Sequence, residues 1–301
     1  MGMAKIIIHS DNSYPRKPAA AFLFSLLVPG LGQVYNGDLM RGIAVALIRT
    51  LPLFLLAAVS IDSTGSSCIR AFFLMLAAFF ILAIASALEA CIVACIRTEL
   101  PKRFFNRAQW YVLFAAVSIG FTSLALIMVC VNLAFGRVRT ERAGPLLRQG
   151  DIVLVRRFLP AGIRRGELAW FDEGKAARVI AREEDLVSYV GNVWLVNRSP
   201  LSLGYLKNEA VARYGAVVEE VLSESTEGRR YPICFKYSPL LAPKGIVSPI
   251  PKGSLLVADD TRTIPGFSRL VPADSLKGRV EGIVYSSRLR MIGIDGYGGL
   301  Q

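Results

Sequence analysis

The chain has 301 residues, of which 53% are hydrophobic, and a formal net charge of +12 at pH 7. This composition is too apolar for an ordinary soluble protein and indicates a membrane protein. In a membrane chain, excess Lys and Arg are typical of residues that flank spans and face anionic lipid, and no nucleic-acid motif accompanies the charge. We therefore expect membrane lipid, and no nucleic acid, among the partners.

The amino-terminal part combines a basic segment with an interrupted apolar run. No small-residue cleavage pattern follows residues 1–18, so we expect the segment to be retained. Residues 19–35 are broken by Pro29, Gly30 and Gly32, which leaves fewer uninterrupted apolar residues than the roughly 20 that a spanning helix needs. The pattern predicts a re-entrant or interfacial helix, and a fourth crossing is the alternative.

This interrupted run also carries a short motif. Its pieces are Lys17-Pro18, the stretch from Pro29 to Gly37 that reads PGLGQVYNG, and Arg41-Gly42. They resemble a motif of small bacterial membrane domains. The resemblance implies a membrane location and no chemistry.

Three long apolar segments follow, at 42–60, 71–96 and 110–135, and each is long enough to cross a bilayer core of about 30 Å. The connector 97–109 has four Lys or Arg residues, whereas the connector 61–70 has one Arg. By the positive-inside rule, the more basic connector and the amino terminus are cytoplasmic. Three spans then place the carboxy-terminal domain on the extracytoplasmic side.

Two ionisable residues interrupt the spans at a similar depth. Arg49 lies seven residues into the first span, and Glu89 lies seven residues before the end of the second. At a rise of about 1.5 Å per residue, each is about 10 Å from the cytoplasmic end of its helix. An unpaired charge there costs about 2.5–3.5 kcal/mol, which favours an Arg49–Glu89 pair as a structural clamp. The alternative is that Arg49 extends to the cytoplasmic surface and Glu89 is neutral.

Beyond residue 136 the apolar runs shorten, and Gly, Pro and charged residues return. Short runs rich in Val, Ile, Leu, Phe and Trp between polar breaks are typical of successive antiparallel strands. The sequence thus predicts an α-helical transmembrane domain at 1–136 and a mainly β, antiparallel domain at 137–301.

Several short motifs follow one another in this second domain. They are Gly150-Asp151, Arg165-Gly166-Glu167, Ala177-Arg178-Val179-Ile180 with Asp185, Pro251-Lys252-Gly253, Asp259-Asp260-Thr261-Arg262, Phe267-Ser268-Arg269, Val271-Pro272 and Gly278-Arg279. Their order and spacing resemble the outer domain of type I signal peptidases, the serine/lysine class. The resemblance leaves out only about 200–248, and it implies a β domain outside the bacterial cytoplasmic membrane.

Catalysis in the family that this domain resembles needs two side chains. A serine attacks the peptide bond, and a lysine kept neutral by burial takes the proton of the serine. The resemblance places the serine position at Arg142 and the lysine position at Ala177. Arginine offers no nucleophile and alanine no base, so both partners of the dyad are predicted to be missing.

A shift of two residues gives an alternative dyad. Thr140 lies two residues before Arg142, and Lys175 lies two before Ala177; a shift of two keeps a side chain on the same face of a strand. Ser268 matches a family serine that helps the lysine rather than attacking the substrate. Against this dyad, Lys175 follows a polar, turn-like stretch in which a lysine is usually solvated and charged.

The resemblance also marks residues that hold the strands around the site. They are Gly150, Asp151, Arg178, Asp260 and Arg262. Because these residues are close to apolar strands, we predict buried or half-buried ion pairs among their charged members.

Metal and cofactor sites are not predicted. Cys91 and Cys95 are four residues apart on one span and Cys130 is on another, which is typical of buried packing rather than a metal framework. His9 is the only histidine, and it is predicted on the opposite side of the membrane from the β domain. A Ser-His-Asp triad is therefore excluded.

These patterns favour a signal-peptidase-like membrane protein that has lost its catalytic pair. It would bind extended or exported peptides by strand addition, or act as a scaffold. The alternatives are a membrane endopeptidase that uses Thr140 and Lys175, and an accessory protein in which the membrane spans matter most.

Overall fold

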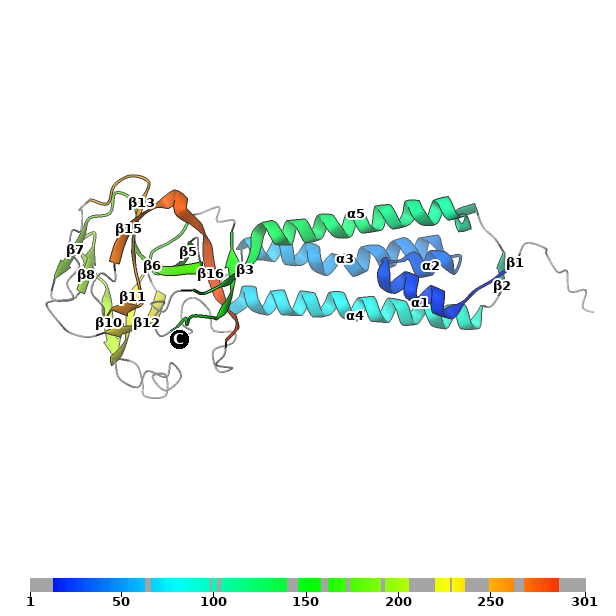
Figure 1. The fold of residues 1–301 in the computed structure, drawn as a ribbon, viewed down its shortest axis with the longest axis horizontal. Coiled ribbons are helices and arrows are strands. Elements are labelled where there is room, and N and C mark those ends of the chain that lie inside the picture. Colours follow the sequence, from blue (N-terminus) through cyan, green and yellow to red (C-terminus); the bar gives the residue numbers. More distant parts are fainter. Residues whose placement is uncertain are drawn as a thin grey trace, which may run out of the picture. The chain divides into compact units, whose positions relative to one another are not determined.

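A computed structural model gives the fold of the chain (Figure 1). Its contacts divide the chain into two compact units. The helical unit comprises Met1–Val59 and Ala71–Cys130, and the β unit comprises Ser60–Arg70 and Val131–Gln301. The structure describes residues 13–62, 66–97, 99–101, 104–139, 146–157, 162–171, 174–190, 193–205, 220–227, 229–235, 249–262 and 268–286.

Three long helices make up most of the helical unit. They are α3 (Leu39–Asp62), α4 (Ser66–Ile96) and α5 (Ala108–Asn132), and they run alongside one another in Figure 1. In the described part of the chain, these three helices are long and apolar enough to cross a membrane. Large apolar side chains such as Leu74 and Ile81 are exposed. Extensive apolar exposure is unusual for a protein in water and is expected of helices that face lipid.

A helical hairpin precedes these helices. Helix α1 (Pro18–Leu27) begins with proline, which is favoured at a first helical position because the missing N–H would have no partner there. A turn then leads into α2 (Leu31–Tyr35). The backbone N of Lys17 donates to the hydroxyl of Tyr35 (3.0 Å), so the hairpin begins and ends at one place, as a re-entrant segment does. The smaller elements of this unit are β1 (Ser13–Pro15), which pairs with β2 (Glu99–Pro101), and the 3-10 helix η1 (Phe104–Asn106).

The third predicted span extends beyond the end of helix α5. The apolar run 110–135 predicts one continuous span, but α5 ends at Asn132 and strand β3 (Leu133–Arg137) follows at once. Strand β3 pairs with β4 (Ile152–Arg156) along its whole length. Periodicity alone does not separate a short apolar strand from the end of an apolar helix, so the partner strand decides. The β unit accordingly takes in the chain from Val131.

An antiparallel sheet of seven strands organises the β unit, in the order β15-β13-β6-β5-β16-β4-β3. Its strands not yet given are β5 (Leu168–Phe171), β6 (Lys175–Ala181), β13 (Ser254–Ala258), β15 (Ser268–Pro272) and β16 (Leu276–Tyr285), with the 3-10 helix η4 (Ala273–Ser275) before β16. The predicted combination of a helical region and a mainly antiparallel β region is thus confirmed.

Two smaller sheets complete the described part of this unit. One is ordered β10-β11-β12-β14, in which the β12–β14 pairing is parallel, and the other is ordered β7-β8-β9. Their strands are β7 (Val187–Val190), β8 (Val193–Val196), β9 (Ser199–Pro200), β10 (Ser202–Tyr205), β11 (Glu220–Thr226), β12 (Arg229–Phe235) and β14 (Thr261–Arg262).

The core of the β unit is built by alternation along the strands. On β6, Ala176 packs into one apolar cluster, whereas Ala177 and Val179 pack into another. Successive side chains of a strand point to opposite faces, so a strand covered on both faces reads as nearly continuous apolar sequence. Strand β6 is such a strand, since the described residues after Lys175 are all buried.

Candidate functional site

Two chain segments next to the predicted dyad positions meet at the start of β6. The backbone N of Arg139 donates to the carbonyl O of Gly174 (2.9 Å). Gly174 has φ +75°, and a Cβ there would lie 2.4 Å from the carbonyl O of Arg137, so only glycine allows this approach. Thr140 and Arg142 follow Arg139 in the sequence, but they lie outside the described residues.

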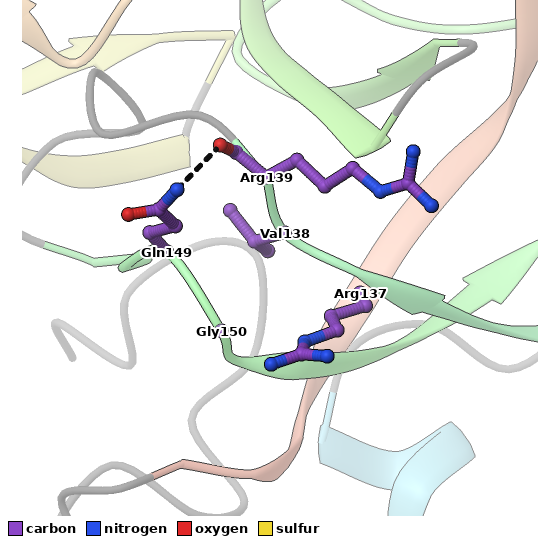
Figure 2. A pocket seen from close by; sticks show the side chains of 5 residues that line it. All are labelled: Arg137, Val138, Arg139, Gln149 and Gly150. Carbon is purple, nitrogen blue, oxygen red and sulfur yellow. Dashed lines mark hydrogen bonds between the residues drawn. The ribbon is translucent and has the colours of Figure 1, made fainter.

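A pocket with a volume of about 350 Å³ opens beside this contact (Figure 2). It is lined by Arg137, Val138, Arg139, Gln149 and Gly150. The Nε2 of Gln149 donates to the carbonyl O of Arg139 (3.2 Å), while the side chain of Arg139 extends away from Gln149. Both charged residues among these five are arginines, so the described lining is basic and suits anionic or carbonyl groups.

The Gly150-Asp151 turn forms one wall of this pocket. The backbone N of Gly150 donates to the carbonyl O of Val138 (2.8 Å), and the backbone N of Val138 donates to the carbonyl O of Asp151 (2.9 Å). The buried carboxylate of Asp151 accepts from the backbone N of Arg148 (2.9 Å) and from the hydroxyl of Ser286 (2.6 Å). Gly150 and Asp151, predicted as parts of a frame, therefore fix the backbone beside the pocket.

Ala177, at the predicted lysine position, belongs to the core. Its side chain is 1% exposed and packs in an apolar cluster with Ala169, Val179 and Val257. Such surroundings would desolvate a lysine and lower its pKa, but alanine carries no proton acceptor. The surroundings of Ala177 are thus apolar, and its side chain is no base.

The structure does not bring Lys175 and Ser268 together. Ser268 pairs with Ala258, and Ala258 pairs with Arg178, so these three share one face of the sheet. Lys175 lies three positions before Arg178 on β6 and is exposed, so it projects from the opposite face. Three residues along a strand and two strand spacings each amount to about 10 Å. Ser268 is therefore not a helper of Lys175.

Arg178 and Asp260, both predicted as frame residues, form a fully buried ion pair. The Nε and Nη2 of Arg178 donate to the two carboxylate oxygens of Asp260 at 3.0 and 2.5 Å. The guanidinium lies 4.1 Å from the ring centroid of Tyr231. Burial alone would lower the pKa of Arg178, but the charge of Asp260 raises it above its ordinary value. Arg262, the remaining predicted frame residue, ends β14, and its side chain lies outside the described part.

A second buried charge cluster was not predicted from the sequence. Arg279 donates to Glu167 (2.8 Å) and to Glu281 (2.7 Å), and Arg156 lies 3.0 Å from the same Glu281 oxygen. These side chains are at most 7% exposed. The signal for them was the occurrence of charged residues inside the apolar runs that form β4 and β16. Both carboxylates of this cluster are buried and paired with arginines of neighbouring strands, so we interpret the cluster as structural.

A third ion pair ties two turns together. Arg165 donates to both oxygens of Asp185, at 2.5 and 2.9 Å. The same carboxylate accepts from the backbone N of Arg182 (2.7 Å) and from Asn197 (3.0 Å). Burial alone would raise the pKa of Asp185, but the hydrogen bonds, chiefly that from Arg165, lower it below its ordinary value.

This lowered pKa predicts how stability depends on pH. The stabilisation by the Asp185 carboxylate should be complete above its unfolded-state pKa of about 3.9 and should be lost as the pH falls through the lower folded-state pKa. Wild type should therefore melt at a higher temperature than Asp185→Asn at pH 7, with the difference shrinking below about pH 4. Thermal unfolding of the full chain in detergent at several pH values measures the difference in melting temperature. A difference that is constant from pH 7 to pH 3 would contradict this assignment.

In the helical unit, Arg49 and Glu89 have separate partners in place of the predicted pair. Arg49 donates through Nη1 to the carbonyl O of Ser25 (2.7 Å) and through Nη2 to that of Leu26 (3.0 Å). The last carbonyls of a helix lack intrahelical donors, so the end of α1 offers Arg49 acceptors at close range.

Glu89 is occupied by two other residues. It accepts from the side-chain amide of Gln33 (2.8 Å) and from Arg41 (3.1 Å). Arg49 and Glu89 do not pair because the hairpin α1–α2 offers polar groups to both α3 and α4. The packing of the hairpin could not be predicted from the sequence, so Arg49 and Glu89 were predicted to pair with each other.

The fold defines a chain with three candidate membrane spans joined to a mainly antiparallel β unit. No protein-family model matches this chain, and neither does any curated protein.

Proposed function

We propose that this chain is a multi-pass protein of the bacterial cytoplasmic membrane whose β unit binds extended peptides on the outer side without cleaving them. Three candidate spans support the membrane location. The concentration of Lys and Arg between the second and third spans supports a cytoplasmic amino terminus and an extracytoplasmic β unit. The order of motifs similar to signal peptidases supports the peptide ligand.

The observation that carries this proposal is the environment of Ala177. It is buried in an apolar cluster two residues from the exposed Lys175, close to the contact between Arg139 and Gly174. A serine/lysine dyad needs a lysine in such surroundings, because only desolvation makes its amine neutral enough to accept a proton. The apolar surroundings of Ala177 and the absence of an amine there support a β unit that binds peptides and has no base to activate a nucleophile.

Backbone pairing is the expected mode of peptide binding. An extended peptide that adds to a sheet gains main-chain hydrogen bonds in any sequence, and pockets for alternate side chains give specificity. The pocket beside Arg137 and Arg139 lies where the segment after β3 meets β6. Its two arginines favour peptides with a carboxylate at the matching position.

The first consequence is the absence of proteolysis. We expect the purified full-length chain in detergent to leave an exported precursor intact under conditions in which an active signal peptidase cleaves it, because Arg142 and Ala177 supply no dyad. Gel mobility and the mass of the precursor measure this. Thr140→Ala and Lys175→Ala should leave the result unchanged.

A second candidate function is proteolysis by Thr140 and Lys175. The specific observation in its favour is the hydrogen bond from Arg139 N to Gly174 O (2.9 Å), since each of these residues immediately precedes a member of the alternative dyad. Cleavage that is lost in both alanine variants, but kept in Lys252→Ala, would establish this function. Lys252 is a suitable control because its side chain is 85% exposed.

A further inference from the structure

A second pocket of the β unit lies directly at the end of helix α5. The backbone N of Arg157 donates to the carbonyl O of Asn132 (2.8 Å), and Asn132 is the last residue of α5. Arg157 therefore lies at the level at which the chain leaves the third candidate span. It lines a pocket with a volume of about 340 Å³.

The described lining of this pocket combines cations with aromatic rings. Arg157 and Lys277 are the cations, and Phe135, Trp170 and Phe171 are the aromatic residues. This combination is typical of the bilayer surface, where Trp rings sit at headgroup level and Lys or Arg meet phosphate.

Two glycines bring these side chains together. A Cβ on Gly278 would lie 2.3 Å from the carbonyl O of Arg156, so only glycine lets β16 approach β4 this closely. Lys277 precedes Gly278 and Arg157 follows Arg156, so both cations lie next to this close approach. A Cβ on Gly136 would lie 2.4 Å from the ring of Trp170, so this ring lies directly against β3. The pocket is thus a consequence of backbone packing and not of surface side chains alone.

We propose that this pocket binds the phosphate headgroup of an anionic phospholipid. Arg157 and Lys277 would contact the phosphate, and the Trp170 ring would cover the glycerol. Val131, near the end of α5, and Phe135, which lines the pocket, are both exposed apolar residues, as expected where a chain leaves the acyl region. The proposal rests on the membrane location proposed above for α5, but not on the peptide ligand.

Quenching of Trp170 fluorescence tests this site. The full chain with Trp110→Phe is placed in phosphatidylcholine nanodiscs that contain a small fraction of brominated phosphatidylglycerol or, for comparison, brominated phosphatidylcholine. The other remaining tryptophan, Trp194, is 1% exposed and is shielded from quencher. We expect stronger quenching by phosphatidylglycerol at equal bromine content.

The charge variants make the test specific. Each of Arg157→Gln and Lys277→Gln should reduce the preference for phosphatidylglycerol about fivefold, as one basic residue at an anionic surface contributes. The double variant Arg182→Gln/Lys252→Gln removes two exposed cations elsewhere and should leave it unchanged.

Three outcomes would overturn the proposal. Equal quenching by the two lipids would show no anion preference, and an equal loss in the control variant would show a nonspecific charge effect. Relief of quenching by soluble glycerol phosphate, added in the amount of the lipid, would assign the pocket to a free phosphate. A chain that does not enter nanodiscs at all would instead contradict the membrane location.

Discussion

Replacing Asp260 with alanine should destabilise the β unit by about 3–5 kcal/mol, because the buried Arg178 would keep its charge and lose the carboxylate that balances it. Both side chains are 0% exposed, and two hydrogen bonds join them. Urea or thermal unfolding of the full chain in detergent, followed by tryptophan fluorescence, measures the change. It is the largest effect that we expect from a single side chain in this unit.

Two further variants separate burial from charge in this prediction. Lys252→Ala removes an exposed pair with Glu184 and should change the stability by less than about 1 kcal/mol. The double variant Arg178→Leu/Asp260→Leu removes both charges of this pair and should be more stable than Asp260→Ala alone. If Asp260→Ala melts like wild type, the pair does not hold the sheet together.

A comparable loss is expected in the helical unit from Gly30→Ala. Gly30 has φ +82°, and a Cβ there would lie 2.0 Å from the carbonyl O of Gly42. The left-handed backbone and the forced separation of the hairpin from α3 each cost about 1–3 kcal/mol. We therefore expect a loss of about 3 kcal/mol or more in thermal unfolding in detergent.

The same helical unit contains a matched control. Gly120 lies in α5, and a Cβ there would meet no other atom within 4 Å. Gly120→Ala should therefore be neutral or slightly stabilising, since alanine favours the helix by about 1 kcal/mol. Similar melting temperatures for Gly30→Ala and Gly120→Ala would mean that the hairpin does not pack against α3 as described.

Much of the fold follows from local sequence. Long apolar runs predict α3, α4 and α5, and short apolar runs between polar breaks predict the strands on either side of β6, because both patterns act over a few residues. The break at Pro29 and Gly30 likewise predicts a re-entrant or interfacial helix rather than a span. Buried or half-buried ion pairing of Arg178 and Asp260 was also predicted, because both residues adjoin apolar strands and occur in motifs that resemble those of signal peptidases.

Features that depend on long-range packing could not be predicted from local sequence. Arg49 finds its acceptors in the last turn of α1, which no residue spacing relates to α3. Leu133 to Phe135 continue an apolar run but join β4 as a strand, because a partner is present. The cluster of Glu167, Arg279 and Glu281 unites residues 112 positions apart, and only the sheet order brings them together.

Site-specific photocrosslinking most directly tests whether the β unit holds an extended peptide without cleaving it. A photoreactive residue at position 139 lies beside the basic pocket, and one at position 182 lies beyond the other end of β6, about 25 Å away along the strand. We expect a peptide from an exported precursor to crosslink at Arg139 and not at Arg182, with its mass intact. Equal crosslinking at both positions, or a crosslinked peptide that has lost residues by hydrolysis, would contradict the proposed function.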